Sequence, residues 1–231
     1  MKTFKAFAAP LLAASVLAAG VPAPAAAAGA GAATAQPVDL EDRLDLLAHG
    51  WDHVNYEVHG AARADAAAAL AAQADAVARR YPGRAEPLVW KAIALSTEAG
   101  AKGGLGGLSL AKDARAVLEQ AERLNPNALG DGSVYTSLGS LYYQVPGFPV
   151  GFGDRNKAQA YLRKALAQNP AGLDPNYFYG DFLFRQGQYA EAEKALQRAL
   201  AAPARPGREI ADRGRRAEAA ALLAQVRAKR G

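Results

Sequence analysis

Residues 158–170 read AQAYLRKALAQNP, and the same pattern stands earlier in the chain as ARAVLEQAERLNP at residues 114–126. In both stretches an alanine is followed by a leucine four residues later, an alanine seven residues later and a proline twelve residues later. A third copy places Ala192, Leu196 and Ala199 at the same spacing. Residues so spaced share one face of a helix, where small side chains let a neighbouring helix approach closely. A proline then ends the helix. This recurrence predicts a helical repeat.

Each of these helices is preceded by another predicted helix, which has a recurring residue pattern of its own. A small residue stands beside apolar or aromatic ones, at Gly180, at Gly139 and, more loosely, at Ala92. Little of the remaining sequence alternates with the period of two that strands require. We therefore expect an all-α chain of about four helix pairs, at 39–82, 84–126, 131–170 and 173–203. An amphipathic helix at about 207–229 follows and covers the exposed end of the last pair.

On these marks the stretch from Leu40 to Val226 resembles the tetratricopeptide-repeat (TPR) superfamily. The match to the TPR pattern is good in two copies, fair in one and poor in the first. The resemblance implies a right-handed helical solenoid with a concave groove and no catalytic residues to carry over. The turn PGFPVGFGD and the later DPNYFYGDFLFRQGQYAEAEKAL are similar, more loosely, to exported bacterial TPR proteins. That group includes the TPR component associated with TRAP-type transport systems, whose members are commonly lipid-anchored through a cysteine.

Two of the predicted pairs are longer than the fourth. The extra residues are Gly100–Ser109 (GAKGGLGGLS) and Val145–Asp154 (VPGFPVGFGD), which we interpret as insertions at the turn inside each pair. Because successive units stack in one orientation, the two insertions should emerge side by side. They carry apolar residues such as Leu105 and Phe148. We expect them either to form a lip over the groove near Tyr143 and Tyr177 or to form a small satellite core.

The N-terminal residues have the layout of a secretory signal peptide. Lys2 and Lys5 precede an apolar run, and a tract with several A-x-A-like sites follows it. We expect a signal peptide at 1–28, a disordered leader at 29–37 and the repeat domain at 38–231, with an uncleaved anchor helix as the alternative. The protein is accordingly expected in the periplasm or the medium, without stable membrane insertion after cleavage. The chain has no cysteine, which excludes both disulfides and a lipid-modified cysteine.

Motifs of catalysis and metal binding fail their tests. His49 and His53 are spaced as on a zinc-protease helix, but Gly50 stands where that motif has its glutamate. The glycines of 103–107 lack the lysine and hydroxyl residue of a phosphate loop. The net charge of +5 is too weak to indicate a nucleic-acid partner. We expect no enzyme activity, no cofactor and no metal.

A binding surface is what remains. Side chains of the first helix in each pair line the concave side of a TPR solenoid, and tyrosine, aspartate and arginine suit recognition there. For each residue, packing against a neighbouring helix is the alternative. A protein or peptide partner in the cell envelope is the first hypothesis, and a small ligand or transport accessory role with the ligand under the insertions is the second. The candidate binding residues are Thr136, Ser140, Tyr143, Gln144, Tyr177, Asp181, Phe184, Arg185, Phe148 and Phe152.

Overall fold

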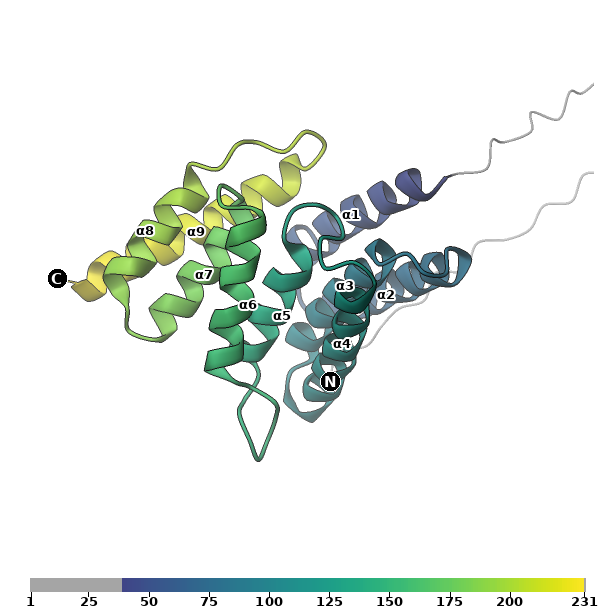
Figure 1. Ribbon diagram of the computed structural model, residues 1–231, viewed down its shortest axis with the longest axis horizontal. Helices are drawn as coiled ribbons and strands as arrows, with labels where there is room; N and C mark the ends of the chain where they lie inside the picture. Colours follow the sequence, from purple (N-terminus) through teal and green to yellow (C-terminus); the bar gives the residue numbers. More distant parts are fainter. Residues whose placement is uncertain (1–38, 231) are drawn as a thin grey trace, which may run out of the picture. The chain divides into compact units, whose positions relative to one another are not determined.

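The computed structural model describes residues 39–230, in which every regular element is an α-helix (Figure 1). The predicted signal peptide and leader lie outside these residues. Within them, no helix combines the length and apolar character needed to span a bilayer. The helices are α1 (Leu40–Tyr56), α2 (Ala62–Arg80), α3 (Glu86–Lys102), α4 (Gly104–Leu124), α5 (Ser133–Gln144), α6 (Arg155–Gln168), α7 (Leu173–Arg185), α8 (Tyr189–Leu200) and α9 (Glu209–Arg230).

The helices pack in sequential pairs, which confirms the predicted all-α, TPR-like fold. Helix α1 packs on α2, α3 on α4, α5 on α6 and α7 on α8. The odd-numbered helices also contact one another in order, from α1 through α3, α5 and α7 to α9. They therefore form a continuous inner layer, and the even-numbered partners lie outside it.

The recurring small residues are the points where paired helices cross. A Cβ atom added to Gly139 would lie 2.6 Å from Leu162 Cγ, and one added to Gly180 would lie 2.8 Å from Leu196 Cγ. Both leucines are completely buried. Equivalent positions in successive repeats thus make the same contact, because only glycine leaves room for the leucine of the partner helix.

Aspartate side chains cap two of the helices. Asp39 caps α1 by accepting a hydrogen bond from the amide of Asp42, and the carboxylate of Asp154 accepts from two amides at the start of α6. Asp174, which precedes a proline as an N-cap residue often does, does not cap its helix. Helix α7 begins at Leu173, with Gly172 at the cap, and Asp174 instead pairs with two arginines.

The interpretation of residues 100–109 as a turn insertion is also wrong. The extra residues lengthen α3 and α4, and only Gly103, with a φ of 62°, separates the two helices. The helices cross tightly there, since a Cβ on Gly107 would lie 2.5 Å from the carbonyl oxygen of Ala99. Residues 145–154 do form a loop, as expected, and it projects at the lower edge of Figure 1 between α5 and α6.

The last helix returns to the first. Helix α9 packs on α8 and α7, as predicted for a capping helix, and it also contacts α1. Arg208, just before α9, forms a two-pronged ion pair with the buried carboxylate of Asp52 on α1, at 2.6 and 3.0 Å. Gly214 lies against the ring of Tyr56, where any Cβ would clash. The inner layer is therefore closed by contacts between residues 156 positions apart.

Candidate binding pocket

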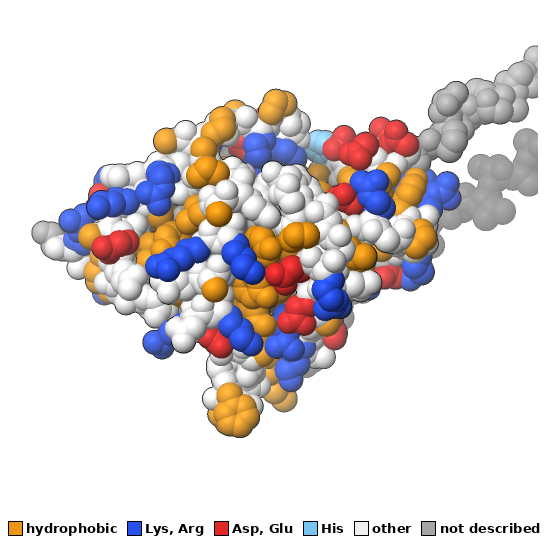
Figure 2. Space-filling model, viewed as in Figure 1, with side chains coloured by type: hydrophobic (Ala, Val, Ile, Leu, Met, Phe, Trp, Pro, Cys, Tyr) orange, Lys and Arg blue, Asp and Glu red, His pale blue; other side chains and the backbone are white. Residues whose placement is uncertain are grey.

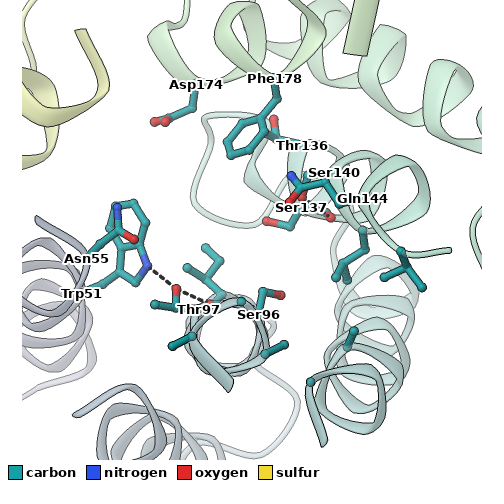
Figure 3. A pocket seen from close by; sticks show the side chains of 18 of the residues that line it. Trp51, Asn55, Ser96, Thr97, Thr136, Ser137, Ser140, Gln144, Asp174 and Phe178 are labelled. Atoms are coloured by element: carbon teal, nitrogen blue, oxygen red, sulfur yellow. Dashed lines mark hydrogen bonds between the residues drawn. The ribbon is translucent and has the colours of Figure 1, made fainter. Parts of the chain in front are cut away.

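The inner layer of odd-numbered helices surrounds a pocket of about 900 Å³ (Figure 3). Helices α1, α3, α5 and α7 each contribute side chains to its wall, and α4, the loop at 145–154 and the start of α9 add to it. Arg63 of α2 and the residues just before α9 also line the pocket. A pocket of this volume lies within the range of sites that hold small molecules or short peptide segments.

An aromatic wall faces the pocket from α1 and α3. The Trp51 and Trp90 rings lie 6.4 Å apart and tilted by 47°. The indole Nε1 of Trp51 donates to Thr97 Oγ1 at 3.1 Å, which fixes the ring against α3 (Figure 3). Phe178 of α7 adds a third ring. Held aromatic rings offer a large contact area at low entropic cost to a ligand.

The opposite wall is a row of polar side chains on one face of α5. Thr136, Ser137, Ser140 and Gln144 follow one another along this face and line the pocket (Figure 3). Ser140 Oγ donates to the backbone oxygen of Ser137 at 3.0 Å. Thr136 is 4% exposed, and its hydroxyl has no hydrogen-bond partner among residues 39–230. A buried hydroxyl without a partner is costly, so Thr136 is a polar group that the fold leaves unsatisfied beside the pocket.

Charged side chains gather where α7 and α9 meet the pocket. Asp174 accepts from Arg205 Nη1 and from Arg215 Nε, each at 2.8 Å. Burial opposes ionisation of Asp174, but the two guanidiniums outweigh it and hold the pKa of this carboxyl below its ordinary value. At Asp131 burial raises the pKa of the carboxyl above its ordinary value. A hydrogen bond of 2.9 Å that this carboxyl accepts from the amide of Ser133 opposes the rise but does not cancel it.

The mouth of the pocket has an exposed apolar rim. Leu105 is 84% exposed and Val150 is 60% exposed, and both line the pocket. Leu108 reaches the loop, since a Cβ on Gly151 would lie 3.3 Å from its Cδ1 atom. The two predicted insertions therefore meet at the pocket mouth. Neither Tyr143 nor Tyr177 lines this pocket, so the expected position of a lip beside these tyrosines is wrong.

Three of the ten predicted binding residues, Thr136, Ser140 and Gln144, line the pocket. A further three form a packed cluster between α5 and α7: Tyr143 donates to Asp181 at 2.7 Å, and Asp181 pairs with Arg185. Burial and the Asp181 carboxylate raise the pKa of Tyr143 well above its ordinary value. These side chains satisfy one another, as the packing alternative predicted.

The remaining four predicted residues lie apart from the pocket wall. Tyr177 packs on Phe178 and under Arg215, and Phe184 packs on Tyr189. Phe152 lies edge-on to Tyr142, with the Arg115 guanidinium 4.3 Å above its ring. Phe148 is 93% exposed, in the loop whose apolar tip marks the lower edge of Figure 2.

Sequence reasoning missed the residues that the first pair and the C-terminal segment bring to the pocket. Trp51, Asn55 and Arg63 come from the pair that matches the repeat pattern least, and Arg205 and Arg215 come from beyond the fourth pair. One signal was available, because Trp51 and Trp90 are the two tryptophans of the chain and both line the pocket. The contribution of α9 had no signal, since the α1–α9 contact arises only from the curvature of the array.

A second, shallower groove lies between α4 and α6 on the outer side. The rings of Tyr142 and Tyr161 stack there with centroids 5.7 Å apart. The Tyr161 hydroxyl donates to Glu122 at 3.3 Å, and burial together with this carboxylate raises the pKa of Tyr161 to about 12. Both carboxylates of this groove already have partners within it, Tyr142 for Glu119 and Tyr161 with Lys164 for Glu122, which favours the inner pocket as the candidate site.

Comparison with known proteins agrees with this architecture. A family model described as tetratricopeptide repeat matches residues 150–208, from the loop through α6, α7 and α8 to the residue before α9. The match identifies a tetratricopeptide repeat within residues 150–208, and the sequential helix pairs of the rest of the described chain have the same TPR-like arrangement.

Two solved structures are similar over most of the chain. One is TTC0263, a thermophilic TPR protein of Thermus thermophilus, with 19% identity, a TM-score of 0.41, and coverage of 79% of this chain and 100% of that one. The other is the MamA RS-1 ArsTM double mutant, with 17% identity, a TM-score of 0.44, and coverage of 83% and 97%. No curated protein sequence matches the chain.

Proposed function

We propose that this protein is a non-catalytic TPR scaffold of the cell envelope that binds a protein partner by taking a short segment of it into the inner pocket. The observation that carries the proposal is the pocket of about 900 Å³ with its aromatic wall and its unpartnered Thr136 hydroxyl. A packed structural interior would have filled this volume and satisfied this hydroxyl.

The apolar rim supports a macromolecular partner. Leu105, Phe148 and Val150 are three of the five large hydrophobic residues that stand exposed in the described part of the chain, and two of them border the pocket. Exposed apolar residues concentrated at one place typically mark an interaction surface. A partner that inserts a segment into the pocket would cover this rim with its surrounding surface.

A second candidate is a small-ligand or transport accessory role, and the closure of the inner layer favours it. The α1–α9 contact and the Asp52–Arg208 ion pair limit the length of any segment that lies across the pocket. The sequence resemblance to the TPR component of TRAP-type systems points to the same class of role.

Filling the pocket tests both candidates. Ser137→Trp places an indole in the cavity, and Gln197→Trp, on the exposed face of α8, is the matched control. Protein captured from periplasmic extract by the wild type and the control but lost with Ser137→Trp supports the first candidate. A small molecule retained in native mass spectrometry, again lost only with Ser137→Trp, supports the second. Equal capture by all three proteins would refute a role for the pocket.

Export is proposed on the signal-peptide layout of the first residues. N-terminal sequencing of protein recovered outside the cytoplasm should give a start between about Ala25 and Gln36, where small residues form cleavable A-x-A-like sites. Recovery of intact Met1 in the membrane fraction would contradict it.

A further inference from the structure

Four arginines line the pocket, and three of them are neutralised within the structure. Arg205 pairs with Asp174 and Asp212, and Arg215 pairs with Asp174 and Glu218. Arg208 is held by Asp52. The N–H donors of these three guanidiniums are directed at aspartate and glutamate side chains of the protein itself. The three arginines therefore link helices, and few of their donors are left for a ligand.

Arg63 is different. Its guanidinium donates through Nη2 to the neutral side-chain oxygen of Asn55, and it forms no ion pair with any residue in the described range 39–230. Its Nε is buried and has no hydrogen-bond partner there. A guanidinium carries five N–H donors and a permanent charge. Arg63 therefore brings a positive charge without a carboxylate partner to the pocket wall.

The surroundings of Arg63 add an apolar surface next to this charge. Asn55, which orients the guanidinium, follows Trp51 by one turn of α1, and both side chains line the pocket. Trp51 in turn lies against Trp90. Arg63 therefore shares the pocket wall with this pair of indole rings, which offers an apolar surface to a ligand whose anion pairs with the guanidinium.

We propose that Arg63 is the anion-binding residue of the pocket, and that the ligand carries a carboxylate attached to an aromatic or apolar group that packs on Trp51 and Trp90. A single planar guanidinium suits the two oxygens of a carboxylate. The inference rests on the proposed function of the pocket and names the chemistry of its ligand. The carboxylate belongs either to a small organic acid or to the C-terminus of a peptide.

Tryptophan fluorescence tests the inference directly, because both tryptophans of the chain line the pocket. The probes are 3-phenylpropionate and its neutral amide, and a short peptide ending in phenylalanine with a free or an amidated C-terminus. In at least one of these pairs the acid should bind the wild type about tenfold or more tightly than the amide, since a charged hydrogen bond is lost in the amide. The pair that shows the preference identifies the source of the carboxylate.

Arg63→Gln should abolish the preference and leave the affinity for the amide unchanged, and Arg63→Lys should restore part of it. Arg79→Gln is the control, since Arg79 lies on the same helix, its side chain is 71% exposed, and it is outside the pocket. Circular dichroism of each variant verifies folding. The inference is overturned by equal affinity of acid and amide for the wild type, by no saturable response to any probe, or by a preference that survives in Arg63→Gln. In those cases the pocket-filling comparison still decides the proposed function separately.

Discussion

Replacing Gly139 with alanine is expected to destabilise the protein, although alanine is the better helix former. The intrinsic preference alone would stabilise the helix by about 1 kcal/mol. The added methyl group would lie 2.6 Å from Leu162 Cγ and 3.2 Å from the backbone nitrogen of Leu162. These atoms lie at or close to the backbone of α6, so they cannot move aside without shifting the helix.

Overpacking of this kind costs about 1–3 kcal/mol, so the net loss at Gly139 is about 0–2 kcal/mol. Gly180→Ala should behave alike, because its Cβ would lie 2.8 Å from Leu196 Cγ. Gly106 is the matched control: it is also helical, but a Cβ there has nothing within 4 Å. Gly106→Ala should therefore gain about 1 kcal/mol.

Urea unfolding of the three variants measures the comparison, with the free energy of unfolding taken from midpoint and slope. We expect Gly139→Ala and Gly180→Ala to fall about 1–3 kcal/mol below Gly106→Ala, the size of the overpacking cost alone. If all three variants gain equally, glycine is not required at the crossing, and the explanation of the repeat by close helix approach is wrong.

Three other predictions concern packing, closure and titration. Ala192→Leu and Ala165→Leu should each lower the free energy of unfolding by about 1–3 kcal/mol, because both alanines are completely buried. Ala201→Leu, on the surface, should lower it little. Wild-type urea midpoints for the two buried variants would contradict the repeat register. Asp52→Ala should lower the free energy of unfolding by about 3 kcal/mol, which is the lower end of the range for breaking a buried ion pair, because Arg208 keeps some contact with water. An unchanged thermal midpoint would show that the α1–α9 contact is not maintained in solution. Because the pKa of Tyr161 is raised in the folded protein, the unfolded chain loses the phenol proton at a lower pH than the folded one. The free energy of unfolding should therefore fall as pH rises from about 10 towards about 12. Tyr161→Phe should remove this tyrosine's share of the fall, measured by urea unfolding at several alkaline pH values.

The helix pairs could be predicted from the sequence because they depend on local patterns. The spacing of Ala158, Leu162 and Ala165 fixes which face of α6 is buried, and the prolines and glycines mark where helices end. The insertion at 100–109 was misread for a local reason as well. Glycines indicated a long turn, but Gly107 packs closely on Ala99, and the two helices extend until only Gly103 separates them.

The candidate site was predicted less well, because the inner face of a helix does not by itself reveal which side chains pack and which remain open. Tyr143 and Ser140 lie on the inner side of α5, and Asp181 lies on the inner side of α7. Ser140 lines the pocket, but Tyr143 donates a hydrogen bond to Asp181 between the two helices and does not line it. Whether a polar side chain pairs with a neighbour depends on distances between helices, and these are set by the curvature of the whole array.

The sequence by itself determined the class of fold, the number of helix pairs and the residues of their crossings, since each follows from periodicity within one or two helices. Only the tertiary structure decided that α9 returns to α1, that Asp52 meets Arg208, and that Arg63 faces the pocket without a carboxylate partner in the described residues. The physical reason is that small rotations between successive helix pairs add up along a solenoid. Residues far apart in the chain are brought together by that sum, which no local stretch of sequence encodes.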